Sequence, residues 1–364
     1  MARIAVLSES TNASDLVTSE LRRLLQERFG DGGKGWVPIA KGWGAHLHQD
    51  VEWSHSGWRP YIVNWGEAPL GRYGLGGVLF TSAGRGSWAT YATARRGTAG
   101  RAVSRFRLFY LAWPGGGEVS LRLDDGEPER LDTRADAPED RVHEVRAPLG
   151  AHRLEVRSGD GDVRLYGMVM ETDGPGVVVD ALAYPGVSAG QLDHFDPEHL
   201  AAQVGLRETD LLVFWLGGAD VGVRAFSREW ILEHYGGAIR NMRRGRPEAS
   251  CLVVSTLDRA RARDGRVRSR PGVSRVVASQ EAVARAEGCG YFDLYGATGG
   301  EGTMERWSRS GPRYAAPDLT HLTAAGAAHV GALLHRELLR GYEAFLDPSD
   351  SIIGSDPSRM VRRR

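Results

Sequence analysis

Hydrophobic and polar residues follow two different patterns along this chain. Near the start, residues 3–7 form a continuous apolar run, which is typical of a strand covered on both faces. The next segment has helical period, and we expect a helix that has Ser14 as its N-cap and that Gly30 terminates. Its apolar positions recur on one face, at Val17, Leu21, Leu24 and Leu25.

The same alternation of apolar runs and helical segments returns after Pro175. We expect further strands at residues 177–179, 211–216, 251–255 and 291–294. Between and after them we expect a short helix that opens at Asp196-Pro197, then helices over residues 227–242, 276–286 and 323–345. Strands that alternate with helices imply a parallel sheet with helices on both faces. The two ends of the chain therefore predict one α/β domain of the three-layer, flavodoxin-like kind.

Residues 36–171 show a period of two instead of a helical period, and they are rich in Gly and Trp. Such alternation is typical of half-buried antiparallel strands. We expect one hairpin around the turn at 124–127 and a second around the turn at 158–161, the latter joining strands at 154–157 and 163–166. This segment predicts an antiparallel β-sandwich, inserted between the first helix and the second strand of the α/β domain.

These patterns divide the chain into three parts. Residues 1–35 and 172–346 are expected to form the discontinuous α/β domain, and residues 36–171 the inserted sandwich. Residues 347–364 are polar, hold two prolines and end in three arginines, so we expect a disordered tail.

Charge and composition narrow the classes of partner. Lys+Arg and Asp+Glu both number 46, which argues against a broad surface for nucleic acid. No apolar run is long enough to span a bilayer, and residues 1–7 are too short for the apolar core of a signal peptide. We expect Cys251 and Cys289 to be buried free thiols, with a single disulfide as the alternative.

Two polar segments at the ends of the α/β pattern suggest chemistry. Ser10 follows the first strand, at the edge where open α/β sheets place their sites. Asp318 and His321 share a short loop before the last helix. A carboxylate there can hold the imidazole Nδ1–H, which leaves Nε2 to take a proton from a serine. Each segment alone also fits an ordinary capped turn, but together they predict a triad.

The order of these segments resembles that of the SGNH/GDSL serine hydrolases over nearly the whole chain. The nucleophile block, residues 8–10, stands where the family has Gly-Asp-Ser. The second block, residues 180–186, resembles the one whose glycine N–H helps to bind the oxyanion. The third block, residues 217–220, stands where the family has a Gly-x-Asn core, and the His block is residues 318–321. A sandwich inserted after the nucleophile block is similar to the O-acetyl-peptidoglycan esterase branch, where the insert looks like a carbohydrate-binding module.

The resemblance implies a role for each matching residue. Ser10 would attack the acyl carbonyl, His321 would act as general base and then acid, and Asp318 would orient it. The N–H groups of Ser10 and Gly186 would bind the oxyanion. Gly218 and Ala219 would complete that site from the third block.

Three positions depart from the family pattern. Ser8 and Glu9 replace the glycine and aspartate of the nucleophile turn. Ala219 replaces the asparagine whose amide would donate to the oxyanion, and losing one such donor costs roughly 10²–10³ in kcat. Asn12 is a candidate for the missing donor.

Two clusters in the insert have more than one interpretation. His46, His48 and His55 invite a metal site, but no second cluster or cysteine accompanies them, so we expect a polar strand or loop instead. Several tryptophans crowd into the same region, and they fit a glycan platform and a buried core equally well: Trp36, Trp43, Trp53, Trp58, Trp65 and Trp88.

We therefore predict a serine esterase that removes O-acetyl groups from a carbohydrate or a cell-wall polysaccharide. Its substrate would be an acylated carbohydrate or another small ester, with no cofactor and no metal. The alternative is a weakly active or inactive relative that binds glycans. The resemblance suggests a periplasmic or extracellular location, whereas the residues show no leader.

Overall fold

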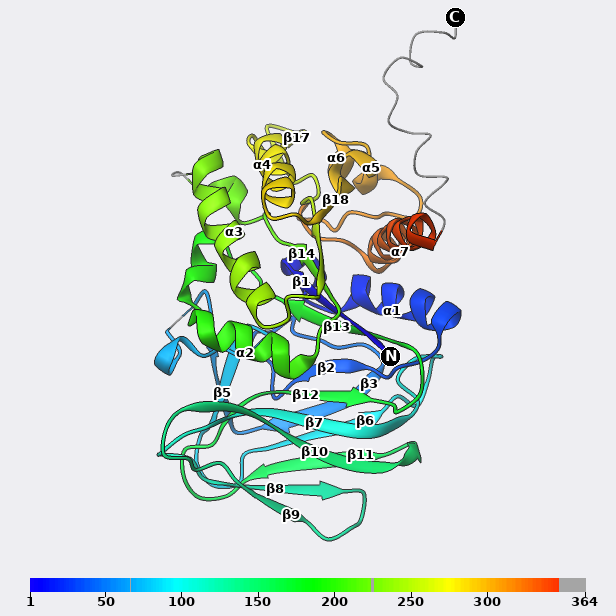
Figure 1. Cartoon of the computed structure of the whole chain (residues 1–364). Helices are drawn as coiled ribbons and strands as arrows, with labels where there is room; N and C mark the ends of the chain where they lie inside the picture. The colour runs from blue at the N-terminus through cyan, green and yellow to red at the C-terminus, as the bar shows by residue number, and fades with distance from the viewer. Residues whose placement is uncertain (66, 224–225, 347–364) are drawn as a thin grey trace, which may run out of the picture.

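The computed structural model describes residues 1–65, 67–223 and 226–346 (Figure 1). The tail predicted at 347–364 lies outside the described residues. At the centre of the α/β part is a five-stranded parallel sheet in the order β13-β1-β14-β15-β18. Its strands are β1 (Ala2–Ser8), β13 (Val177–Ala183), β14 (Leu211–Trp215), β15 (Ser250–Val254) and β18 (Gly290–Phe292).

Helices cover both faces of this sheet, as the sequence predicts (Figure 1). On one face lie α1 (Leu16–Phe29) and α7 (Ala324–Leu346). On the other lie α2 (Pro197–Arg207), α3 (Arg228–Arg244) and α4 (Val273–Ala286). Successive side chains of β1 point to opposite faces of the sheet. Ile4 and Val6 pack with α1, while Ala5 and Leu7 pack on the other side. Two short helices, α5 (Leu294–Ala297) and α6 (Thr303–Arg309), follow β18.

The segment between α1 and β13 forms two antiparallel sheets that share one apolar core. One sheet has the order β10-β7-β12-β5-β4, with β2 paired to β12. It comprises β2 (Gly35–Pro38), β4 (Trp58–Ile62), β5 (Val78–Ser82), β7 (Val103–Ala112), β10 (Glu139–Gly150) and β12 (Arg164–Glu171). The other has the order β3-β6-β11-β8-β9. It comprises β3 (Val51–Ser56), β6 (Trp88–Thr93), β8 (Glu118–Leu123), β9 (Glu129–Asp132) and β11 (Arg153–Ser158). This architecture is sandwich-like, while the exact domain limits at residues 36 and 171 stay a prediction.

One of the two predicted hairpins is wrong. β8 and β9 do form an antiparallel pair around the turn at 124–127. In contrast, β11 pairs with β6 and β8, whereas β12 lies in the other sheet between β7 and β5. The burial patterns give the reason, because β12 is buried at every position and β11 only at alternate ones. The turn between them therefore crosses from one sheet to the other.

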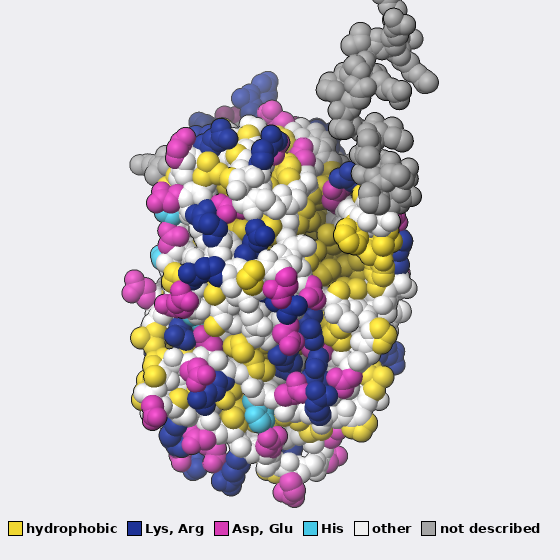
Figure 2. All heavy atoms as spheres, in the orientation of Figure 1, with side chains coloured by type: hydrophobic (Ala, Val, Ile, Leu, Met, Phe, Trp, Pro, Cys, Tyr) yellow, Lys and Arg dark blue, Asp and Glu magenta, His cyan; other side chains and the backbone are white. Residues whose placement is uncertain are grey.

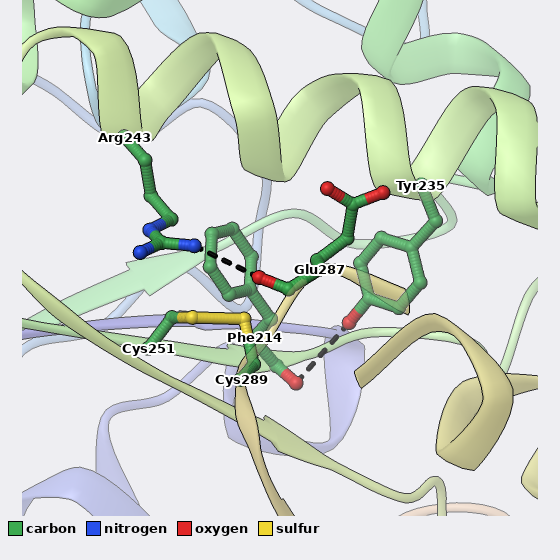
Figure 3. The surroundings of a disulfide bond; sticks show 6 residues. All are labelled: Phe214, Tyr235, Arg243, Cys251, Glu287 and Cys289. Atoms are coloured by element: carbon green, nitrogen blue, oxygen red, sulfur yellow. Dashed lines mark hydrogen bonds between the residues drawn. A yellow bond between two sulfur atoms is a disulfide. The ribbon is translucent and has the colours of Figure 1, made fainter. Parts of the chain in front are cut away.

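The expectation of free thiols is also wrong, because Cys251 and Cys289 form a disulfide (Figure 3). β15 and β18 are neighbours in the sheet, which brings the two positions together at one end of both strands. Helix α3 covers the bond, and on that helix Arg243 donates from Nη1 to the carbonyl of Glu287 over 2.8 Å. Spacing along the chain carries no sign of this proximity, since it arises only from strand order.

We predict that the disulfide stabilises the α/β part. It closes a separation of 38 residues, for which loss of unfolded-state entropy predicts roughly 4 kcal/mol. The double variant Cys251→Ser/Cys289→Ser should lower the free energy of unfolding by about that amount in urea titrations under non-reducing conditions. Equal stability of wild type and variant would contradict this prediction, as would two alkylatable thiols in the unfolded, unreduced wild type.

Candidate active site

The candidate site lies where three neighbouring strands end. Ser8, the last residue of β1, is in register with Ala183 of β13 on one side and with Trp215 of β14 on the other. The Glu9 N–H donates to the carbonyl of Trp215 over 3.0 Å, which carries the pairing one residue beyond the strand. The nucleophile block and the loops of the second and third blocks therefore leave the sheet side by side.

The three predicted triad residues form a continuous hydrogen-bonded chain. His321 Nε2 lies 2.9 Å from Ser10 Oγ, and His321 Nδ1 lies 2.6 Å from Asp318 Oδ2. The other Asp318 oxygen accepts the N–H groups of Thr320 and His321, over 3.0 and 2.9 Å. The His321 and Asp318 side chains are 41% and 52% exposed, so solvent and substrate can reach them.

Hydrogen bonds keep Asp318 ionised. Partial burial acts to raise its pKa, but the His321 ring and the two backbone N–H groups lower that pKa below its ordinary value. An ionised carboxylate accepts Nδ1–H and fixes the imidazole tautomer that leaves Nε2 free to accept a proton.

Glu9 links the nucleophile block to the third block. Its buried carboxylate accepts the Gly218 N–H over 2.6 Å through Oε2. The other oxygen accepts the hydroxyls of Thr11 and Thr256, over 3.1 and 3.2 Å. Arg259 pairs with Oε2 at 2.9 Å. The departure from aspartate at this position therefore connects segments that are far apart in the chain.

Comparison with known proteins decides the family. Residues 150–329 match the sequence model of the GDSL-like Lipase/Acylhydrolase family. The part of the chain that matches, residues 150–329, belongs to the GDSL-like lipase/acylhydrolase family. No curated protein matches the chain.

Among solved structures, the chain is similar to one described as "Peptidoglycan O-acetylesterase in action, 5 min". The two share 20% sequence identity at a TM-score of 0.79, over 94% of this chain and 92% of that one. This likeness extends the shared fold to the inserted strands. A family two carbohydrate esterase from Cellvibrio japonicus matches with a TM-score of 0.33 and 11% identity, over 80% of this chain and 97% of that one.

The structure contradicts two of the expectations for oxyanion donors in this GDSL-family protein. Asn12 is buried and its side chain is fully used, because Oδ1 accepts the N–H groups of Val17 and Thr18 and Nδ2 donates to Ser8 Oγ over 3.1 Å. Its side chain thus binds N–H groups in the first turn of α1, whose N-cap is Asp15, one residue later than the expected Ser14. The Gly218 N–H is bonded to Glu9, so it is not free to donate to a substrate.

Gly186 and Ala219, the remaining predicted positions, lie in the loops that follow β13 and β14. Gly186 follows β13 with a φ of 73°, a left-handed conformation that suits glycine. Asn64, from the inserted segment, donates to the neighbouring Pro185 carbonyl over 2.5 Å. Ala219 is partly exposed and caps the 3₁₀ turn Asp220–Gly222 without a side-chain hydrogen bond. Sequence reasoning missed Asn64, Thr256 and Arg259, because none lies in a segment that resembles a family block.

Asp220 is buried and links the third block to the 3₁₀ helix Ala189–His194, which follows the second block. Its Oδ1 accepts the Ala189 N–H over 2.9 Å. Burial raises the pKa of Asp220 from its ordinary value of 3.8 to about 7, and the Glu9 carboxylate adds to this increase, although the Ala189 N–H opposes it.

The histidines and tryptophans of the insert mostly belong to its core. No group of three potential ligands suited to a metal ion exists among the residues that the structure describes. The His46 ring stacks on Trp43 at 3.7 Å, and burial lowers its pKa to about 3, so it is neutral. Trp36 is 1% exposed, whereas Trp65 is 64% exposed, which is more than any other of the predicted six.

We predict that Asp220 makes stability depend on pH. Because its pKa is higher in the folded than in the unfolded protein, the stabilisation is complete below pH 4 and is lost as the pH rises through 7. Asp220→Asn keeps the acceptor for Ala189 but cannot ionise. Between pH 5 and pH 8, wild type should lose about 2 kcal/mol of unfolding free energy relative to this variant. Parallel pH dependence of the two proteins in urea unfolding would contradict the assignment.

Proposed function

We propose that this protein is a serine esterase that removes O-acetyl groups from a carbohydrate or a cell-wall polysaccharide. The observation that carries the proposal is the hydrogen-bonded chain from Ser10 through His321 to Asp318. Its position at the strand ends of a GDSL-family α/β fold supports the same reading. An oxidising compartment, such as the periplasm or the exterior, fits the Cys251–Cys289 disulfide.

The reaction would proceed in two steps. His321 Nε2 takes the proton of Ser10 Oγ as that oxygen attacks the acyl carbon, and the N–H groups of Ser10 and Gly186 bind the oxyanion. The protonated His321 then gives its proton to the departing sugar oxygen, which leaves acetyl-Ser10 and a free hydroxyl. In the second step a water loses its proton to His321 and attacks the acetyl group, which releases acetate and restores Ser10.

A groove in the inserted segment supports a carbohydrate substrate. It has a volume of about 380 Å³ and is lined by residues that include Arg59, Tyr61, Trp65 and Glu67. Exposed aromatic rings such as Trp65 stack on the faces of sugars, while the charged side chains offer hydrogen bonds to hydroxyls. Asn64 joins this region to the second block through Pro185.

The direct test of the proposal is the hydrolysis of p-nitrophenyl acetate, together with acetate release from O-acetylated peptidoglycan. Ser10→Ala should lower kcat/KM by at least roughly 10³-fold on both substrates, since loss of the nucleophile leaves only binding and oxyanion stabilisation. Ser14→Ala changes a nearby serine outside the triad and should leave both rates intact. If Ser10→Ala hydrolyses either ester as fast as wild type, the proposal fails.

The groove makes a separate prediction about specificity. Trp65→Ala should raise KM for the O-acetylated polysaccharide about tenfold, because loss of one stacked ring removes roughly 1–2 kcal/mol of binding. The same variant should hydrolyse p-nitrophenyl acetate at the wild-type rate. Leu149→Ala, which removes an exposed apolar side chain from β10, serves as a matched control. An unchanged KM for the polymer would exclude Trp65 as a binding residue.

A second candidate function is glycan binding without turnover. A wide groove of about 730 Å³ on the sheet that contains β3, β6 and β11 favours it. Its lining includes Ser54, Thr90, Arg101 and Arg153. This candidate function is considered because Ala219 stands where the family has an asparagine that donates to the oxyanion. Binding of O-acetylated glycan without Ser10-dependent hydrolysis would establish it.

A further inference from the structure

Beside the candidate nucleophile lies a buried ion pair that no family block predicts. Arg259 Nη2 and Glu9 Oε2 are 2.9 Å apart, and their side chains are only 8% and 4% exposed. Glu9 precedes Ser10, and Arg259 lies in the loop after β15. We propose that Arg259 is a positioning residue which, through Glu9, takes over the function of the asparagine missing at Ala219. This inference rests on the proposed esterase function.

The charge of the Glu9 carboxylate bears directly on the reaction. A buried carboxylate one residue from Ser10 would oppose the negative charge that develops on the acyl oxygen during attack. Arg259 cancels that charge, and it leaves the carboxylate as a hydrogen-bond acceptor for Gly218 and two threonines. Without the guanidinium, Glu9 would be a buried charge without a cationic partner, which is costly.

The Arg259 guanidinium lies against the third block. A Cβ atom on Gly218 would collide with both Arg259 Nη2 and Glu9 Oε2, so the ion pair packs directly against the third block. The next residue is Ala219, where the family has the asparagine amide. Arg259 Nε is buried and has no hydrogen-bond partner among the described residues. Arg259, a cation whose Nε–H is unused, therefore lies beside Ala219, the position that lacks the family's amide donor.

The loop that contains Arg259 is also connected to the His block. The N–H of Ala260, next to Arg259, donates to the carbonyl of Leu319 over 2.9 Å. Leu319 lies between Asp318 and His321 and has a φ of 57°, an unusual conformation for leucine that its neighbours must hold in place. The Arg259 loop thus contacts the nucleophile block, the third block and the His block, and it can fix their relative positions.

The experiment measures kcat and KM for p-nitrophenyl acetate in a set of variants. Arg259→Met should lower kcat about 10²-fold and change KM less than threefold, as expected for stabilisation that acts only in the transition state. Arg259→Lys, which keeps the charge, should retain most of that kcat. Arg261→Met, an exposed arginine of the adjoining strand β16 (Ala260–Arg263), is the matched control and should match wild type.

Ala219→Asn tests the compensation directly. In wild type it should change kcat less than threefold, because the function is already supplied. In the Arg259→Met background it should restore kcat at least tenfold. Should Arg259→Met fail to fold, the double variant Glu9→Gln/Arg259→Met removes both charges, keeps an acceptor for Gly218 and should show the same rescue.

Three results would overturn the inference. One is an Arg259→Met variant with kcat within threefold of wild type. Another is a folded variant of low kcat that Ala219→Asn does not restore, which would make Arg259 a purely structural residue. The last is an inactive wild type that gains activity from Ala219→Asn. If neither wild type nor Ala219→Asn shows Ser10-dependent hydrolysis, the proposed function itself fails.

Discussion

The parallel pairing of β1 between β13 and β14 is the constraint on which the site depends. It ends three strands at the same level, with Ser8 opposite Ala183 and Trp215. The nucleophile block, the second block and the third block therefore emerge together. Only the His block comes from outside these strands, and the hydrogen bond from Ala260 to Leu319 joins it to the loop after β15. The geometry of Ser10 and His321 follows from this arrangement.

Buried charges fix the inserted strands on the α/β part. Glu171, at the end of β12, accepts hydrogen bonds from Arg207 of α2 and Arg3 of β1, and Arg207 also pairs with Asp180 of β13. Burial acts to raise the pKa of Glu171, but Arg207 and Arg3 lower it to about 2, so the network is ionised at any ordinary pH. Removing one partner of a buried ion pair costs much free energy, so these pairs hold the inserted strands firmly on the α/β part. The inserted segment in turn places Asn64 against Pro185 of the second block. On the face seen in Figure 2, basic and acidic side chains are interspersed, in keeping with a net charge of +0.

Much of the fold can be predicted from the sequence, because apolar periodicity reflects burial. Local patterns predict their elements correctly. The apolar run at 211–216 predicts β14, and the spacing of Val17, Leu21 and Leu25 predicts the buried face of α1. Two other features cannot be predicted in this way, because both depend on which strands become neighbours. They are the crossing between β11 and β12 and the Cys251–Cys289 bond. The turn at 124–127 is again a local pattern, and the structure bears it out.

The same distinction applies to the site. Ser10, Asp318 and His321 are found from motif and order, whereas Arg259 has no motif and is brought to Glu9 only by folding. Asn12 was a plausible donor in sequence, but its side chain caps α1. The effect of a residue that departs from a family motif therefore depends on the residues that it contacts in the fold, as the contacts of Glu9 illustrate.

The central claim is that folding activates Ser10 as a nucleophile through His321. The most direct measurement is the rate of covalent labelling by a fluorophosphonate, followed by intact mass and peptide mapping. The account predicts one adduct per chain, on the peptide that contains Ser10, with labelling at least roughly 10²-fold slower in His321→Gln. Labelling at another residue, or an equal rate in the two proteins, would contradict it.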